Sequence, residues 1–395
     1  MPKILRIINR FNIGGPTYNA AYLTKYLSND FETLLVGGEK EKSEDSSEYI
    51  IRNLGIEPVI IPEMHRSINP RHDLVAYRKL KKIIESYKPD IVHTHASKAG
   101  TIGRIAALRS NVPVIIHTFH GHVFHSYFNS YKTKVFQNIE QSLAKKSSKI
   151  VAISDLQKKE LTEKYNITSA NNIEVIPLGF DLDRFHQNNA LKRKEFREKY
   201  NIDDDEIAIG IVGRLVPIKN HDLFLESIKY IKENTSKKIR AFIIGDGESR
   251  HNLEKKSKEL RLDYVDGTQT NKKATLTYTS WIKDIDFAYA GLDIITLTSL
   301  NEGTPVSLIE AQAANKPIVS TNVGGIENVV IPQTTALLSK NDDVNDFSQK
   351  LFSLIEDDNL RFSLSQKGWQ HVHNKFHYSR LVSNTENLYY KLLCG

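Results

Sequence analysis

The feature that most constrains the fold of this chain is a regular alternation of short β-branched runs with longer segments of helical periodicity. Strands that alternate with helices are typical of parallel α/β sheets. A first series of runs ends before residue 180 and reads KILRIIN, TLLVGG, PVIIP, DIVHT, PVIIHT, KIVAIS and IEVIP. A second series begins after residue 205 and reads EIAIGIVG, RAFIIGDG, TLTYTSWI, LDIITLT, KPIVSTN and TALLS. The sequence therefore predicts an α/β protein with two Rossmann-like domains, each built on a parallel sheet.

The length of the chain agrees with this division, because 395 residues are too many for one ordinary hydrophobic core. A charged segment without a strand pattern lies between the two series, and we interpret residues 178–205 as a linker. We expect one domain over residues 1–180 and the other over residues 181–377. Residues 378–395 carry leucines at helical spacing and predict an amphipathic helix that packs back on the first domain.

Composition argues against a disulfide scaffold and against a membrane span. The single cysteine, Cys394, excludes an internal disulfide and a cysteine-built zinc site. No stretch approaches the roughly 20 apolar residues that cross a bilayer, and the first residues resemble a strand more than a signal peptide. We expect a cytoplasmic protein in a reducing compartment.

Charge is distributed unevenly along the chain. Residues 1–180 hold 25 Lys and Arg against 17 Asp and Glu, whereas residues 181–395 hold 29 against 30, so the formal charges are +8 and −1. The basic residues of a predicted helix over 66–88 could attract an anionic membrane surface, or they could form a solvated face without a partner. That helix carries Arg71, Arg78, Lys79, Lys81 and Lys82, and the aromatic residues that could accompany it are Phe124, Tyr127, Phe128 and Tyr131. No nucleic-acid partner is expected.

The most informative segment for chemistry is LTSLNEGTPVSLIEAQAANKPIVSTNVGG, over residues 297–325. A strand is expected to end near Ser299, with Thr304 as the cap and Pro305 in the first turn of a helix that reaches about Ala314. The free amides and the positive dipole end of that helix would form a seat for a phosphate. Gly303 would let the backbone approach this ligand closely.

Two carboxylates, Glu302 and Glu310, bracket the start of this helix. Carboxylates accept hydrogen bonds in pairs from vicinal hydroxyls, which sugars and ribose offer. Each residue alone would most often be an ordinary surface carboxylate. The combined pattern favours a site in which Glu310 meets a ribose and Glu302 meets a transferred sugar.

The segment NEGTPVSLIEAQAANKPIVSTNVGG resembles the two-glutamate signature of retaining glycosyltransferase family 4, which has the GT-B fold. The resemblance extends to most of the chain and is densest over residues 205–330. It is also carried by INRFNIGGPTYNAAYLTKYL, PDIVHTHASKAGTIGRIAA, PVIIHTFHGHVF, VIPLGFDLDRF, GRLVPIKNHDLFLES, IIGDGESRHNLE and SWIKDIDFAYAGLDIITLTS. It implies a metal-independent enzyme that transfers a sugar from a nucleotide diphosphate donor, most simply a UDP-sugar.

The resemblance implies roles for residues of the second domain. Arg214 and Lys219 match the basic pair that holds the donor diphosphate and stabilises the leaving group, in place of a metal ion. Glu310 matches the ribose ligand, and Glu302 matches the carboxylate beside the donor sugar. Gly303 and the following amides would meet the distal phosphate, and the base would lie near 281–283. The remaining implied donor contacts are Thr304, Pro305, Val306, Trp281, Ile282 and Lys283.

In the first domain, Gly14 and Gly15 resemble the family loop beneath the donor phosphates. His120 matches the family histidine that reaches the transferred sugar, and we count it with Glu302, Arg214 and Lys219 as catalytic. The expected acceptor-side residues are His122, His125 and Lys98.

A metal site is the competing interpretation of the histidine-rich segment that contains His117, His120, His122 and His125. The segment follows a strand and does not present ligands one helical turn apart, so we expect no zinc. The acidic runs at 181–183 and 203–205 lie outside the position of a catalytic metal motif.

The signature departs from the usual family pattern at three positions. Asn315 stands where glycine is usual, and asparagine also tolerates a left-handed helix cap. Pro305 and Ser307 replace the usual aromatic and glycine pattern beside the phosphate, which leaves the donor preference open.

The family mechanism implies attack by the acceptor on the face from which the diphosphate leaves, with retained configuration. The acceptor is expected to be a glycan or a lipid-linked glycan of a surface polysaccharide or glycoconjugate. Two alternatives are a nucleotide-sugar epimerase of the same architecture and a non-catalytic protein that binds sugar nucleotides. A dehydrogenase is disfavoured because GDGESR lacks the full glycine fingerprint of a dinucleotide site.

Overall fold

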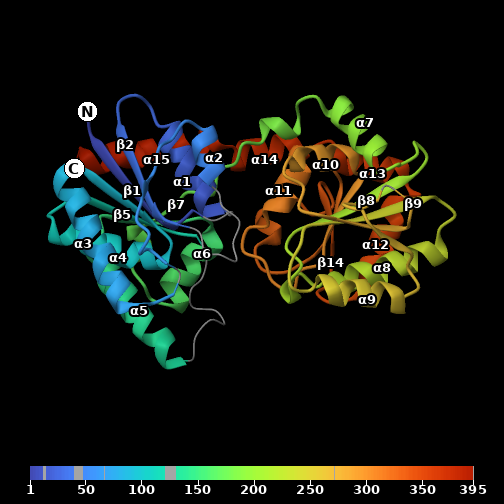
Figure 1. Ribbon diagram of the computed structural model, residues 1–395, viewed down its shortest axis with the longest axis horizontal. Helices are drawn as coiled ribbons and strands as arrows, with labels where there is room; N and C mark the ends of the chain where they lie inside the picture. The colour runs from blue at the N-terminus through green and yellow to red at the C-terminus, as the bar shows by residue number, and fades with distance from the viewer. Residues whose placement is uncertain (12–14, 40–47, 66, 121–129, 271, 395) are drawn as a thin grey trace. The chain divides into compact units, whose positions relative to one another are not determined.

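The computed structural model describes all residues except 12–14, 40–47, 66, 121–129, 271 and 395. The described chain forms two compact units, one of residues 1–180 with 376–395 and one of residues 181–375. Each unit contains a sheet of seven parallel strands with helices on both faces (Figure 1). The prediction of an α/β protein with two Rossmann-like domains is confirmed.

The sheet of the N-terminal unit has the strand order β3-β2-β1-β4-β5-β6-β7. Its strands are β1 (Lys3–Arg10), β2 (Glu32–Gly38), β3 (Val59–Ile60), β4 (Ile91–His95), β5 (Val114–Phe119), β6 (Lys149–Ala152) and β7 (Ile173–Val175). Its helices are α1 (Gly15–Lys25), α2 (Glu48–Asn53), α3 (Pro70–Tyr87), α4 (Ser97–Arg109), α5 (Ser130–Ala144), α6 (Asp155–Lys159) and α15 (Tyr378–Leu393), with short turns η1 (Glu160–Lys164) and η2 (Ala170–Asn172). All seven apolar runs of the first series form strands, because parallel strands covered on both faces must be apolar throughout.

The sheet of the C-terminal unit has the order β10-β11-β9-β8-β12-β13-β14. Its strands are β8 (Ile207–Val212), β9 (Ile239–Ile244), β10 (Tyr264–Asp266), β11 (Leu276–Ser280), β12 (Ile294–Leu297), β13 (Ile318–Thr321) and β14 (Ala336–Ser339). Its helices are α7 (Asn189–Lys199), α8 (His221–Asn234), α9 (Arg250–Glu259), α10 (Ile285–Gly291), α11 (Val306–Ala313), α12 (Val344–Glu356), α13 (Asp358–Ser365) and α14 (Gly368–Phe376), with short turns η3 (Asp183–Phe185), η4 (Pro217–Lys219) and η5 (Ile326–Asn328). The sequence did not predict β10, a three-residue edge strand that pairs with β11 alone.

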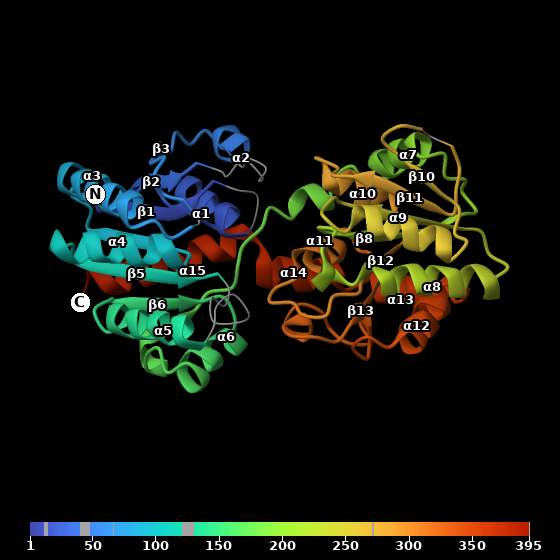
Figure 2. The same cartoon turned by 60° about the horizontal axis from the view of Figure 1, so that its bottom comes forward.

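Helices cover both faces of each sheet, so each unit has its own core. In the C-terminal unit, α8, α9 and α12 pack on one face, while α10 and α11 lie on the other (Figure 2). In the N-terminal unit, α3 and α4 enclose one core with the sheet. The opposite face is covered by α1 and by α15, whose Leu381, Val382 and Leu388 are buried there. The terminal helix thus has the amphipathic character that its leucine spacing indicates.

Two predicted segments differ from the structure. The helix expected over 66–88 begins at Pro70, because the side chain of Asn69 caps it by accepting hydrogen bonds from the N–H groups of Arg71 and His72. It ends at Tyr87, since Lys88 adopts a left-handed conformation at φ 53°. The segment interpreted as a linker contains a helix, α7, which packs on α10 within the C-terminal unit. The sequence pattern did not indicate this helix because most of its residues are charged, although Phe196 is buried in the unit.

Candidate functional site

The C-terminal sheet changes its direction of winding between β8 and β12. Ligands of such sheets bind outside the carboxyl ends of the strands at this switch point. Gly213 and Arg214 directly follow β8, and residues 298–305 follow β12. The two loops contact each other, since the N–H of Leu300 donates to the carbonyl of Ile218 at 2.9 Å. The segments singled out for donor binding therefore share one edge of the sheet.

Lys219 and Glu302 form an ion pair at this edge, with Nζ 2.5 Å from Oε1. Ser299 donates its hydroxyl to the same oxygen at 2.7 Å. The backbone on both sides is fixed, because the Thr298 hydroxyl donates to the Lys219 carbonyl at 2.9 Å. The pair keeps limited contact with solvent, with side-chain exposures of 23% for Lys219 and 11% for Glu302. A ligand can therefore reach both charges.

Helix α11 begins at Val306, one residue later than the sequence suggested. Pro305 is the cap, with extended φ −72° and ψ 101°, and no side chain of the described residues caps the helix. The assignment of Thr304 as the cap was wrong, because the chain is still extended at Pro305 and Thr304 lies one residue too early. The first-turn amides consequently have no competing side-chain oxygen, which suits an anionic ligand. Asn315 does adopt the left-handed conformation expected after this helix, with φ 53°.

Two glycines of the loop after β13 hold the Glu302–Gly303 backbone in place. The N–H of Gly325 donates to the Glu302 carbonyl at 2.9 Å. A Cβ on Gly324 would lie 2.1 Å from that carbonyl oxygen, and a Cβ on Gly325 would lie 1.8 Å from the carbonyl oxygen of Gly303. By contrast, among the described residues other than its chain neighbours, no atom lies within 4 Å of where a Cβ on Gly303 would be. The Glu302–Gly303 backbone is therefore packed against Gly324 and Gly325, while the Cα of Gly303 faces open space.

Arg214 is exposed, and no ion pair or hydrogen bond within the described part of the chain engages its guanidinium. Its loop is held by the GDG segment after β9, since a Cβ on Gly245 would lie 1.9 Å from the Gly213 carbonyl oxygen. Gly245 has φ 141°, so a side chain there would be strained as well. The loop therefore presents a cation that is free to meet a phosphate.

Glu310 projects from the second turn of α11 and is partly buried. Burial raises the pKa of its carboxyl to about 7, against the opposing effects of the Arg184 guanidinium and the Tyr289 hydroxyl. That hydroxyl also donates to the Ser307 carbonyl at 2.9 Å, which places it beside the first turn of the helix. Glu310 thus has a polar frame suited to accepting hydrogen bonds from vicinal hydroxyls.

The 281–283 segment follows β11 at the same edge of the sheet. Trp281 is 50% exposed, so it is not the core residue that a lone tryptophan usually is. Ile282 is half-buried and Lys283 is exposed. Ser280 before them has φ 55° and donates its hydroxyl to Asp246 at 2.8 Å, which fixes the turn that directs the segment.

In the N-terminal unit, His120 follows β5 and pairs with His95 at the end of β4. Nδ1 of His95 lies 2.9 Å from Nε2 of His120. Burial lowers the pKa of His120 to about 3, so its imidazole is neutral near pH 7. His117, three residues earlier and within β5, bonds instead to the Thr94 hydroxyl at 2.9 Å. His120 therefore contacts His95, whereas His117 contacts Thr94.

Other predicted residues of this unit are less informative. Lys98 is held by Asp73 and by the Ser67 carbonyl, each at 2.5 Å, so its ammonium is engaged within the unit. Gly15 begins α1. Gly14, His122 and His125 lie outside the described residues, as do Phe124, Tyr127 and Phe128.

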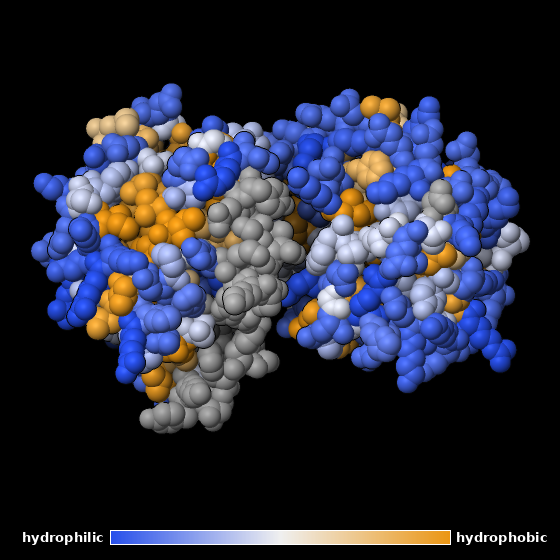
Figure 3. Space-filling view, in the orientation of Figure 1, coloured by the Kyte–Doolittle hydropathy of each residue, from blue (hydrophilic) through white to orange (hydrophobic). Residues whose placement is uncertain are grey.

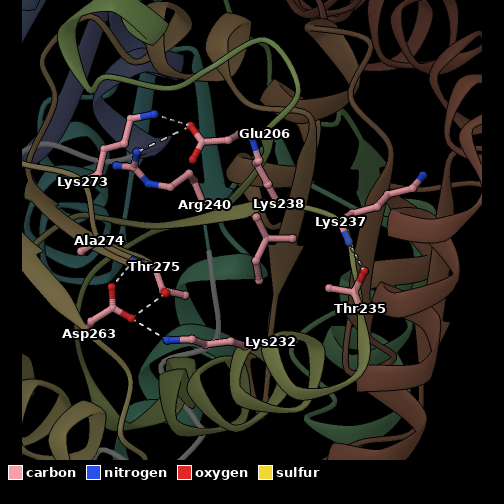
Figure 4. A pocket seen from close by; sticks show the side chains of 11 residues that line it. Glu206, Lys232, Thr235, Lys237, Lys238, Arg240, Asp263, Lys273, Ala274 and Thr275 are labelled. Atoms are coloured by element: carbon pink, nitrogen blue, oxygen red, sulfur yellow. Dashed lines mark hydrogen bonds and ion pairs between the residues drawn. The ribbon is translucent and has the colours of Figure 1, made fainter.

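A separate pocket of about 350 Å³ lies at the opposite, amino edge of the C-terminal sheet (Figure 4). Its cations are already paired: Lys232 with Asp263 at 2.6 Å, and Lys273 with Glu206 at 3.4 Å. Figure 4 shows these side chains turned toward one another. Within the described part of the chain, each cation that lines this pocket has a carboxylate partner, in contrast to Arg214 at the carboxyl edge.

The sequence reasoning missed the residues that support the site. The sequence predicts only that Ser299 ends a strand, whereas its hydroxyl contacts Glu302. His95 lies in the HTH run and pairs with His120. Gly324 and Gly325 end the signature segment, and the sequence alone does not indicate their contacts. Two adjacent glycines after a strand were a usable signal, because such a pair often marks close approach of two backbones.

Comparison with known proteins gives a consistent result. The model described as "Glycosyl transferases group 1" matches residues 192–371, and the one described as "Glycosyltransferase Family 4" matches residues 13–184. The chain is 31% identical to the UDP-Gal:alpha-D-GlcNAc-diphosphoundecaprenol alpha-1,3-galactosyltransferase of Escherichia coli, over 83% of this chain and 82% of that enzyme. It is 28% identical to the capsular polysaccharide biosynthesis glycosyltransferase CapM of Staphylococcus aureus, over 84% of each.

The fold also resembles solved structures. HepE of Anabaena in complex with UDP superposes with a TM-score of 0.81 at 16% identity, over 98% of this chain and all of that one. WaaG, a glycosyltransferase involved in lipopolysaccharide biosynthesis, superposes with a TM-score of 0.71 at 15% identity, over 98% of this chain and 99% of that one. At these identities the likeness concerns the fold alone.

Proposed function

The chain belongs to glycosyltransferase family 4 and is a GT-B glycosyltransferase, and from this premise we propose that it transfers a sugar from a UDP-sugar with retention of configuration and without a metal ion. One observation carries the proposal. Lys219, Glu302 and the uncapped start of α11 lie together at the switch point of the C-terminal sheet. A cation, a carboxylate and free amides at one sheet edge suit a diphosphate joined to a sugar.

The donor is assigned by its chemistry. Arg214, Lys219 and the first amides of α11 would bind the diphosphate, Glu310 the ribose and Glu302 the sugar hydroxyls. Uridine is supported by the UDP-Gal in the name of the E. coli relative and by the UDP complex of HepE. The 281–283 segment at the same edge is the proposed seat of the base.

The proposed reaction follows from these contacts. The acceptor oxygen attacks the anomeric carbon on the face from which UDP departs, and the bond from that carbon to the β-phosphate oxygen breaks. The electron pair goes to the departing phosphate oxygen, which takes the acceptor proton. Two cations at the diphosphate stabilise the charge that develops there, which is the role a metal ion would otherwise fill. Neutral His120 is the proposed contact of the N-terminal unit with the donor sugar.

We further propose that the acceptor is a glycan or a lipid-linked glycan of a surface polysaccharide. The E. coli relative is named for a diphosphoundecaprenol-linked acceptor, and the S. aureus relative for capsular polysaccharide biosynthesis. A lipid-linked acceptor would require the enzyme to work at the inner face of the membrane.

Helix α3 is the proposed contact with that membrane. Among the described residues no helix is both long and apolar enough to span a bilayer, so the proposed attachment is peripheral. Ile68 and Leu74 are 61% and 48% exposed beside the exposed basic residues Arg71 and Arg78. Figure 3 shows apolar side chains gathered on the visible face of this unit. Apolar groups set among cations suit an anionic interface.

The donor proposal is tested by thermal shift with UDP-, GDP- and ADP-sugars, in the presence and absence of EDTA. A ligand that binds only the folded state raises its stability, so the UDP-sugars should give the largest rise, and EDTA should leave it unchanged. Proton NMR of the product should show the anomeric configuration of the donor. An inverted product, or transfer that stops in EDTA, would contradict the proposal.

The membrane proposal is tested by flotation with vesicles of anionic phospholipid. Attachment should weaken with added salt and on replacement of Arg71 and Arg78 by glutamate. Flotation that is equal with neutral and anionic vesicles would contradict it.

A further inference from the structure

We propose that Ser299 is a positioning residue that fixes the plane of the Glu302 carboxylate for the donor sugar. The inference rests on the donor role proposed above for Glu302. Ser299 is fully buried, and its hydroxyl donates to Oε1 of Glu302 at 2.7 Å. Lys219 contacts the same oxygen at 2.5 Å. Within the described residues no hydrogen bond engages Oε2, so Oε2 is the oxygen presented to a ligand.

Ser299 is itself held rigidly. Its carbonyl accepts a hydrogen bond from the hydroxyl of Thr321 at 2.7 Å, and Thr321 is also fully buried at the end of the neighbouring strand β13. The N–H of Gly325 donates to the Glu302 carbonyl at 2.9 Å. The serine hydroxyl therefore meets Glu302 from a fixed backbone.

The two partners of Oε1 differ in what a donor would do to them. Lys219 has three donor hydrogens on a flexible stem, and the proposed function draws its ammonium toward the diphosphate. Ser299 has one hydroxyl hydrogen, and it is committed to Glu302. When the donor is bound, Ser299 is the partner that keeps the carboxylate in place.

The carboxylate needs such a partner, because the terminal torsion of a glutamate is broad and has no sharp staggered minimum. Without the serine, the carboxylate plane can rotate and Oε2 no longer faces one direction. A sugar hydroxyl that depends on this oxygen then loses alignment, whereas the nucleotide, held by other residues, does not.

The test compares Ser299→Ala with a matched control, Ser320→Ala. Ser320 is also fully buried on the adjacent strand, and its hydroxyl donates to the Thr321 carbonyl at 2.9 Å without contact to Glu302. Calorimetry gives the Kd of UDP and of UDP-galactose, and steady-state transfer gives kcat and KM for the donor. Glu302→Ala and the double variant complete a mutant cycle.

We expect Ser299→Ala to bind UDP within about twofold of the parent chain and to lose about tenfold in kcat/KM, the usual effect of a hydrogen bond to a charged group. The kcat/KM of Ser299→Cys, which retains a weak donor, should lie between that of the parent chain and that of Ser299→Ala. The cysteine variant also serves as the test if the alanine variant does not fold. In the Glu302→Ala background the serine substitution should have no further effect, because its target is gone. Ser320→Ala should keep the parent kcat/KM.

Equal losses of UDP affinity and of kcat/KM in Ser299→Ala would overturn the inference. So would multiplicative losses in the double variant, or the same loss in Ser320→Ala. If the parent chain binds no uridine nucleotide, the proposed function and this inference are both overturned. Calorimetry of UDP binding to the parent chain distinguishes that outcome from a failure of the inference alone.

Discussion

The ammonium of Lys219 lies 2.5 Å from Oε1 of Glu302, so the cation proposed for the diphosphate and the carboxylate proposed for the sugar neutralise each other in the free protein. A donor that binds here supplies two phosphates to the lysine and hydroxyls to the carboxylate. The donor would replace this ion pair with two sets of contacts. Without a donor, the ion pair itself compensates the two partly buried charges.

Replacement of Lys219 by alanine should abolish the rise in Tm on addition of a UDP-sugar, because the diphosphate loses a charged partner. Lys232→Ala is the matched control, since Lys232 forms a 2.6 Å ion pair with Asp263 at the opposite edge of the sheet. The control should keep the parent shift. A Lys219→Ala variant with an unchanged shift would remove this lysine from the site.

Replacement of Glu310 by glutamine should stabilise the free protein above pH 7 and weaken UDP binding. The pKa of this carboxyl is about 7 in the folded chain against 4.5 as its ordinary value, so the folded state binds the extra proton between these values. Stability from this group is present below pH 4.5 and is lost as the pH rises through 7. The free energy of unfolding of the parent should therefore fall between pH 5 and pH 8 by about 1 kcal/mol more than that of the variant, after allowance for partial solvent contact.

The control for this prediction is Glu327→Gln, which changes an exposed carboxylate near the same unit's loop after β13. Its pH dependence should match that of the parent. If the stability of Glu310→Gln depends on pH as that of the parent does, burial does not raise the pKa of Glu310. If its affinity for UDP is unchanged as well, Glu310 does not bind the ribose.

The N-terminal unit should lose stability on mild acidification. Burial lowers the pKa of His93, His95 and His117 well below 6.5, and lowers that of His120 to about 3. The unfolded chain takes up protons on these residues below pH 6.5 while the folded chain does not, so the free energy of unfolding falls as the pH drops from 6.5 toward 4. Each histidine contributes up to about 1.4 kcal/mol per pH unit in this window.

Urea unfolding at pH 7 and pH 5 measures this effect. His117→Asn should be less stable than the parent at pH 7, because it leaves a cavity, and should show a shallower loss toward pH 5 because one titrating group is gone. An equal slope for both chains would contradict the assignment.

Much of this architecture was predictable, because parallel strands buried on both faces leave unbroken apolar runs in the sequence. The edge strand β10 was missed since its three residues are only half-buried. Helix α7 was missed since eight of its eleven residues are charged or polar, although Phe196 is buried. Glu302 and Lys219 stood out by spacing and by resemblance. Their contact did not, because 83 residues separate them and only the order of β8 and β12 in the sheet brings them together. Ser299 and Gly325 act through a backbone and a hydroxyl, which a sequence pattern does not distinguish from ordinary loop residues.

Gly303→Ala should change ligand binding without changing the stability of the fold. In the part of the chain that the structure describes, no atom beyond the adjacent residues lies within 4 Å of the added Cβ, so the Tm of the variant should stay within about 2 °C of the parent. If a diphosphate approaches over this glycine, the new methyl group meets it, and affinity for UDP should fall at least about tenfold through overpacking. Gly325→Ala is the opposite case, since its Cβ would lie 1.8 Å from the Gly303 carbonyl oxygen and should lower Tm and UDP affinity together. Calorimetry measures the affinity for UDP and thermal unfolding measures Tm, so together they separate a loss of binding from a loss of stability. A Gly303→Ala variant that binds UDP as tightly as the parent would place the phosphates elsewhere.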